Sequence, residues 1–145
     1  MRKIKFRGKR TDNGEWVYGD LIQNVDCVKI REQEKDVKHI AKSFEIDPET
    51  IGQFTGLKDK NGTMIWEGDI VKATVSYNNA FQDRVDVKTN IYEVKYHEKY
   101  CYFYLARKQN NLLFDGNWSY YLKEIEVIGN IHDNSELLKG GVDNE

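Results

Sequence analysis

Residues 91–105 read IYEVKYHEKYCYFYL, with apolar and polar side chains alternating on both sides of a short charged centre. Alternation with a period of two places successive side chains on opposite faces of a strand. The segment therefore predicts a hairpin of two strands, Ile91 to Tyr96 and Tyr100 to Leu105, joined by His97-Glu98-Lys99. Aromatic and β-branched enrichment of this kind favours strands over helices.

The two faces of this hairpin differ in chemistry. One face should enter the core, and it carries Tyr92, Val94, Cys101, Phe103 and Leu105. The other face carries Tyr100, Tyr102 and Tyr104 beside Glu93 and Lys95. Three tyrosines on a solvent-side face suit a subunit interface, a ligand groove or an aromatic ladder. We expect self-association through Tyr100, Tyr102 and Tyr104, and hence a homo-oligomer.

Further strands follow from the same pattern. Asn13-Gly14 and Asn61-Gly62 are hairpin turns, because Asn-Gly accepts the positive φ angles of a type I′ turn. The expected strands are Lys3 to Arg7, Glu15 to Tyr18, Val25 to Ile30, Thr50 to Leu57, Met64 to Trp66, Ile70 to Tyr77 and Glu126 to His132.

Three segments carry weaker signals. Residues 32–44 fit either one short amphipathic helix or a charged loop that leads into a strand from Ser43 to Ile46. Ser76 to Asn90 is polar and predicts a long loop. Tyr121 to Ile125 predicts a single helical turn, so at most one short helix is expected in a mainly β chain.

A pattern of turn residues occurs twice. Phe6-x-Gly8, Asn13-Gly14 and Gly19-Asp20 recur as Phe54-x-Gly56, Asn61-Gly62 and Gly68-Asp69, with one extra residue before the second Gly-Asp. Two hairpins with the same turn chemistry and a duplicated hairpin unit both explain this repetition. Asp20 and Asp69 should each accept a backbone N–H in a turn.

Composition limits the class of protein. The chain has 145 residues, 39% of them apolar, and a net charge of −2, which argues against a polycation that binds DNA by net charge alone. No apolar run approaches the ~18 residues that span a bilayer, and no signal peptide is recognised at the N-terminus. Two cysteines make no disulfide framework, which favours a reducing cytoplasm.

Catalytic and metal-binding patterns are lacking. The sequence holds no Cys-x-x-Cys, phosphate-binding glycine loop, His-Glu-x-x-His or nucleophile elbow. His39, His97 and His132 share no ligand spacing. We therefore expect a non-enzymatic protein without a metal or a cofactor, and the sequence identifies no small-molecule substrate.

The N-terminus is strongly basic, with six Lys and Arg residues among the first ten. Lys3, Lys5 and Arg7 should share one strand face, near Trp16 and Tyr18 of the partner strand. Cations beside aromatic rings suit single-stranded nucleic acid, whose phosphates meet charge while its bases stack. Alternatively, the lysines protect an edge strand from aggregation.

Several spaced motifs in order resemble the YopX family of bacteriophages and prophages of Gram-positive bacteria. They are Phe6-Arg7-Gly8-Lys9, Trp16-Val17-Tyr18-Gly19, Ile51 to Gly62, Ile65 to Val71 and Glu126 to Leu138. Ser135 stands where the family often has proline, and residues 25–42 and 76–90 match poorly. The resemblance implies a β-rich protein with an SH3-like C-terminal half, and it transfers no catalytic residue.

Together these observations predict an N-terminal β-hairpin region over residues 1–62, packed with an SH3-like barrel over 63–134, and a frayed acidic tail over 135–145. Ile70, Val94, Phe103, Leu105 and Ile128 should lie inside the barrel. The expected function is that of a phage-encoded accessory protein, a binding or assembly module in the host cell cytoplasm. The alternative is a nucleic-acid-binding protein of phage replication or regulation that uses the basic N-terminal strand.

Overall fold

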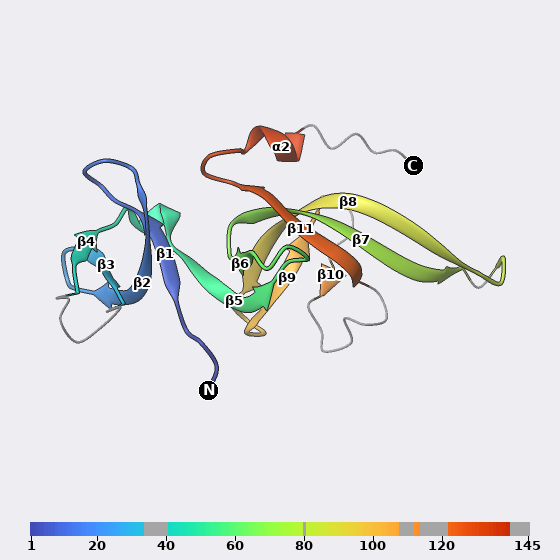
Figure 1. Ribbon diagram of the computed structural model, residues 1–145, viewed down its shortest axis with the longest axis horizontal. Helices are drawn as coiled ribbons and strands as arrows, with labels where there is room; N and C mark the ends of the chain where they lie inside the picture. Colours follow the sequence, from blue (N-terminus) through green and yellow to red (C-terminus); the bar gives the residue numbers. More distant parts are fainter. Residues whose placement is uncertain (34–40, 80, 108–111, 114–121, 140–145) are drawn as a thin grey trace. The chain divides into compact units, whose positions relative to one another are not determined.

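The computed structural model describes residues 1–33, 41–79, 81–107, 112–113 and 122–139 (Figure 1). The described elements are mainly β-strands, which confirms the expected fold class. The chain divides into two compact units, Met1–Gly56 and Leu57–Glu145. The division falls within one strand, six residues before the boundary expected after Gly62.

The first sheet has six strands in the order β4-β3-β2-β1-β5-β6. Their bounds are β1 Phe6–Lys9, β2 Trp16–Gln23, β3 Val28–Glu32, β4 Ser43–Glu45, β5 Gly52–Lys58 and β6 Met64–Trp66. A 3₁₀ turn, η1 Pro48–Thr50, precedes β5, and the Asp47 carboxylate caps it by accepting the Glu49 N–H. Of the two readings of residues 32–44, the strand from Ser43 is confirmed, while residues 34–40 lie outside the described residues.

The core of the first unit lies on one face of β1 to β4. Val17, Ile30 and Ile46 are buried there, and half-buried apolar side chains pack around them. Phe6 belongs to this packing shell, whereas Ile4 precedes β1 and is 54% exposed. The strand predicted from Lys3 to Arg7 therefore begins three residues later than expected, at Phe6.

The second sheet has five strands in the order β10-β9-β8-β7-β11. Their bounds are β7 Asp69–Asn79, β8 Arg84–His97, β9 Tyr102–Ala106, β10 Leu112–Leu113 and β11 Leu122–Asn130. Its core contains Val71, Ala73, Tyr92, Val94, Leu105 and Ile125, with Ile65 of β6 among them. This strand order is compatible with the SH3-like barrel expected for this half, whose closure stays a prediction.

The predicted interior of that barrel is correct in part. Ile70, Val94 and Leu105 are fully or almost fully buried. Phe103 is half-buried and packs edge-to-face on Tyr96, with 5.1 Å between ring centroids. Ile128 is also half-buried, because the register of β11 against β7 shifts between Val127 and Gly129. Such a bulge turns the extra residue out of the regular alternation.

Two other expectations are wrong. The segment predicted as a long loop, Ser76 to Asn90, instead extends the β7–β8 hairpin, whose paired residues run to Asn79 and Arg84. The predicted helical turn is wrong for its described residues, because Leu122 to Ile125 belong to β11. The signal missed in the loop was the alternation of Val85 and Val87, which continues the strand pattern without a core to face.

The segment after β11 is ordered by its own side chains. The Asn130 side-chain oxygen accepts the N–H groups of His132 and Asp133, and the Asn134 side-chain oxygen accepts the Asn130 N–H. A short helix follows, α2 Glu136–Lys139, within the tail that was expected to be frayed. Residues 140–145 of that tail lie outside the described residues.

Candidate functional site

The β8–β9 hairpin presents a cluster of four rings on one face. The pairs Val94–Leu105 and Lys95–Tyr104 confirm which side chains share a face, because directly opposed residues of antiparallel strands point the same way. Val94 and Leu105 are buried, so Lys95 and Tyr104 lie on the opposite side. Cys101 departs from the prediction, because it lies exposed in the turn at φ 56° and not on a strand.

His97 sits at the centre of the three tyrosines. Its ring centroid lies 4.8 Å from that of Tyr100, 5.2 Å from Tyr102 and 6.0 Å from Tyr104. The rings of Tyr100 and Tyr102 are stacked at 6.3 Å with an interplanar angle of 6°. We call His97, Tyr100, Tyr102 and Tyr104 the aromatic face.

The sequence showed only that His97 shares no ligand spacing with His39 or His132. The structure pairs it with Tyr102 across the hairpin, and its Nδ1 is buried without a hydrogen-bond partner in the described residues. Register counting from the Val94–Leu105 pair would have found it, since His97 follows Val94 by three residues and Tyr102 precedes Leu105 by three.

Charges surround the aromatic face on both sides. The Lys99 ammonium lies 5.3 Å from the centroid of the Tyr100 ring. The Lys95 ammonium lies 3.6 Å from a carboxylate oxygen of Glu93, on the same face of β8 as His97. Tyr100 remains 60% exposed. The arrangement is a partly exposed aromatic surface next to charged side chains, and aromatic side chains with a polar rim are common at protein interfaces.

Only some of the residues predicted to form the basic, aromatic face of the N-terminal strand lie together in the structure. Arg7 pairs with Tyr18 and Lys9 pairs with Trp16 across β1 and β2, so all four share one face. The Arg7 guanidinium lies 4.7 Å and the Lys9 ammonium 5.4 Å from the centroid of the Trp16 ring. Arg7 is only 6% exposed, which leaves Lys9 as the more accessible cation on Trp16.

Lys3 and Lys5 precede β1. Lys3 is exposed, whereas Lys5 is half-buried and its carbonyl accepts the Phe54 N–H. Lys9 was not among the candidate residues predicted from the sequence, yet it lies closer to Trp16 along the strand than Lys3 does. Its place in the same alternation as Lys5 and Arg7 was the available signal.

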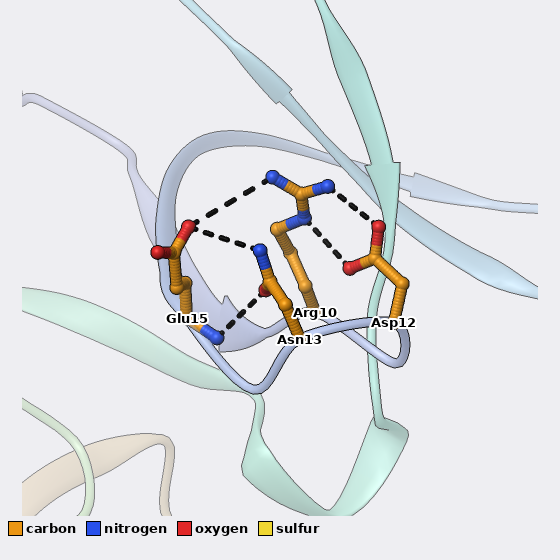
Figure 2. A network of polar contacts seen from close by, with 4 residues as sticks. All are labelled: Arg10, Asp12, Asn13 and Glu15. Carbon is orange, nitrogen blue, oxygen red and sulfur yellow. Dashed lines mark hydrogen bonds and ion pairs between the residues drawn. The ribbon is translucent and has the colours of Figure 1, made fainter.

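The loop between β1 and β2 carries a surface network (Figure 2). The Arg10 guanidinium donates to both carboxylate oxygens of Asp12, at 2.8 and 2.6 Å, and lies 4.0 Å from Glu15. Figure 2 shows Asn13 between the two carboxylates, donating to Glu15 from its side chain and accepting the Glu15 N–H. The hydrogen bond from Arg10 lowers the pKa of Asp12.

Asp59 organises the corresponding loop between β5 and β6. One carboxylate oxygen accepts the N–H groups of Asn61 and Thr63, and the other accepts the Val127 N–H of β11 at 3.0 Å. Burial raises the pKa of this carboxyl, but the hydrogen bonds from Val127, Thr63 and Asn61 outweigh burial and hold it below its usual value. Three donated hydrogen bonds make this carboxylate a structural acceptor.

The two Gly-Asp motifs differ in role. The buried Asp69 carboxylate accepts the Trp66 N–H at 2.7 Å, as the turn predicts. Asp20 lies within β2 and forms an ion pair with Arg31 at 3.1 Å, so its prediction as a turn acceptor is wrong. In the parts of the chain that the structure describes, no group of three or more His, Cys, Asp or Glu side chains could hold a metal ion.

None of the helices within the described ranges has the length and apolar character needed to cross a membrane. No protein with a curated description matches the sequence. Among solved structures, the crystal structure of protein EF1440 from Enterococcus faecalis is similar, with a TM-score of 0.54 and 25% identity. The match covers 95% of this chain and 99% of that chain. The model of the family described as "YopX protein" matches residues 5–139, and this chain therefore belongs to the YopX family.

Proposed function

We propose that the protein is a phage-encoded, non-enzymatic accessory protein that acts as a binding or assembly module in the host cell cytoplasm. Membership of the YopX family supports a phage or prophage origin. The aromatic face carries the proposal, because four rings gather at one hairpin and Tyr100 remains 60% exposed.

A second copy of the chain is the partner that we assign to the aromatic face. Tyrosine combines a large apolar ring with a hydroxyl that can stay hydrogen-bonded, and it is enriched at protein interfaces. Rings that already contact one another lose little side-chain freedom when they are covered, so binding costs less conformational entropy. A two-fold contact would bury the same face on both copies.

Light scattering on charge-bearing variants tests this proposal. Tyr100→Glu and Tyr102→Glu should lower the measured mass, because a buried carboxylate without a partner opposes association. Tyr96→Glu is the matched control, since Tyr96 is exposed on the other face of the same hairpin. Circular dichroism should stay β-rich in all three variants. An unchanged mass for both aromatic-face variants, or a monomeric wild type at about 100 μM (about −5.5 kcal/mol), would reject it.

Binding of single-stranded nucleic acid is the second candidate. Its supporting observation is the stacking of the Arg7 and Lys9 cations on the Trp16 ring, beside the exposed Tyr18. A base can stack on such rings while Lys3 and Lys5 contact phosphates. The overall charge of −2 confines this effect to the basic strand.

Fluorescence anisotropy with a labelled single-stranded oligonucleotide tests the second candidate. Binding should weaken as salt rises from about 50 mM, and Lys5→Glu should weaken it for all sequences alike. Lys123→Glu makes the same charge change on β11 and should bind like the wild type. No binding by the wild type at about 50 mM salt would remove this candidate.

A further inference from the structure

The β7–β8 hairpin continues well beyond the strands that flank it. The pairing of β11 with β7 ends at Val75, and the pairing of β9 with β8 begins only at Glu93. Figure 1 shows the two strands running on together beyond the rest of their sheet. We call the paired segments 76–79 and 84–90 the ribbon.

One edge of this ribbon is formed by β8. Among the described residues, no strand pairs with residues 84–92 of β8 on the side away from β7. Two valines on this strand are largely exposed, Val85 at 59% and Val87 at 53%. A two-stranded hairpin is only marginally stable alone in water, and an open edge is a template for another strand.

The sequence of that edge is self-complementary. We propose that β8 pairs antiparallel with β8 of a second copy, about a two-fold axis at Val87. In this register, Val87 faces Val87, Val85 faces Thr89, and Asp86 faces Lys88. The remaining pair joins Arg84 to Asn90, so all seven residues from 84 to 90 are paired within the bounds of β8.

The two faces of the paired edge are chemically consistent. One face brings together the β-branched side chains of Val85, Val87 and Thr89, which favour cross-strand contacts in sheets. The other face brings each Asp86 opposite a Lys88, twice by symmetry. Asp86 already lies 2.7 Å from Arg84 within its own chain, and its carboxylate can accept from a second cation.

Neighbouring registers are less favourable. An axis at Asp86 would place Asp86 opposite itself and Arg84 opposite Lys88, and like charges directly opposed are destabilising. An axis at Val85 would place Val87 opposite Asp83, which lies in the turn at φ 49° and not in the strand. Charge and the position of the turn therefore favour the axis at Val87.

This contact is separate from the aromatic face. Each of the two contacts is two-fold symmetric, so a chain that uses both would link copies beyond a dimer. Breaking either contact alone should then leave a smaller assembly that the other contact holds together. The ribbon contact consequently needs a test that does not depend on Tyr102.

Cysteine cross-linking of the full chain supplies that test. The native thiols are first removed by Cys27→Ser and Cys101→Ser, and the oxidant diamide accepts the two electrons and two protons of disulfide formation. Val87→Cys should then cross-link between copies, because residues opposed on antiparallel strands have Cβ atoms about 4.5–5.5 Å apart. Val85→Cys is the matched control, since two copies of residue 85 would lie about 13 Å apart, four residues along the strand.

Mixing variants tests the register directly. Val85→Cys and Thr89→Cys chains should cross-link to each other severalfold more than either does to itself. Adding Tyr102→Glu to Val87→Cys should leave the cross-link in place, so that failure of the aromatic-face proposal and failure of this one are distinguishable. Equal yields for Val87→Cys and Val85→Cys, or an unchanged mass for Val87→Lys by light scattering, would overturn the inference.

Discussion

The two copies of the repeated pattern use the same residues for different purposes. In the first copy, Gly8 and Gly19 lie inside strands β1 and β2, where an added Cβ would collide with the Ile46 side chain and the Arg31 backbone. In the second copy, Gly56 and Gly68 adopt φ angles of 89° and 86°, which only glycine reaches readily. Repetition of residue types is therefore not sufficient to establish a duplicated unit, because the matched glycines have different roles in the two copies.

The loops of the two copies share one backbone feature but are held in place by different side chains. In both loops only the glycine has a positive φ angle, 72° at Gly14 and 81° at Gly62. The predicted two-residue type I′ turns are therefore wrong, and longer loops closed by a left-handed glycine take their place. The first loop is held by an exposed network around Arg10, whereas the second is held by the buried carboxylate of Asp59.

The largest expected effect comes from the glycines within strands. Gly19→Ala should lower the free energy of unfolding by more than about 3 kcal/mol, because the backbone of Arg31 cannot move aside without breaking the β2–β3 pairing. Gly56→Ala should cost about 1–2 kcal/mol, since it meets no atom within 4 Å and pays only for its φ angle. Urea unfolding followed by circular dichroism measures both. Gly56→Asn should recover part of the loss, because asparagine tolerates the left-handed region, and recovery by Gly19→Asn would contradict the steric explanation.

Substitution of the loop carboxylates should give the next largest difference in the free energy of unfolding between the two copies. Asp59→Ala should cost about 3 kcal/mol, because three backbone N–H groups lose their acceptor. Asp12→Ala should change stability by less than about 0.5 kcal/mol, as surface substitutions usually do. The same urea series compares them, and similar losses for the two variants would show that the burial of Asp59 does not matter.

Lowering the pH should reveal the contribution of the Asp59 carboxylate to the free energy of unfolding. The folded pKa of Asp59 lies below its usual value of 3.8, so the contribution of this carboxylate to stability is complete above that value and is lost as the pH falls through the folded pKa. Unfolding free energy should therefore fall more steeply below about pH 4 in the wild type than in Asp59→Asn, which cannot titrate there. Parallel curves for the two proteins between pH 2 and 6 would contradict this.

The smallest difference between the two copies is expected at their loop glycines. Gly14→Ala and Gly62→Ala should each cost about 1 kcal/mol, because both adopt left-handed φ angles and neither would meet an atom within 4 Å. Equal losses, measured by urea unfolding, would confirm that turn chemistry alone is shared between the copies. A loss at Gly62 much larger than at Gly14 would instead tie the glycine to the Asp59 bonds.

The sequence predicted most of what alternation and turn residues control. The β8–β9 hairpin and its core residues Val94 and Leu105 follow from local patterns, whereas the strand from Ser43 was one of two alternatives that the sequence left open. The β7–β8 extension did not follow, because its exposed valines have no core to face, and a strand without burial carries a weak signal.

The candidate sites were predictable as faces but not as contacts. Tyr100, Tyr102 and Tyr104 share a side because strands alternate, yet the position of His97 among them depends on the register of the turn. Arg7 was expected to be a surface cation, and its burial could not be read from alternation within β1 alone. Burial depends on what the fold brings over a face, which no local pattern encodes.

The hydrogen bond that the Val127 N–H donates to Asp59 has a consequence for the order of folding during synthesis. It spans 68 residues, whereas the Arg10–Asp12 bond of the first loop spans two. At a synthesis rate of about 5–20 residues per second, the two residues of the first loop's bond are made almost together. Val127, in contrast, is synthesised roughly 3–14 s after Asp59. Until β11 is synthesised, the Asp59 carboxylate lacks the hydrogen bond that joins its hairpin to β11. During this time the second sheet of the nascent chain is incomplete, and β7 is open to pairing with other strands.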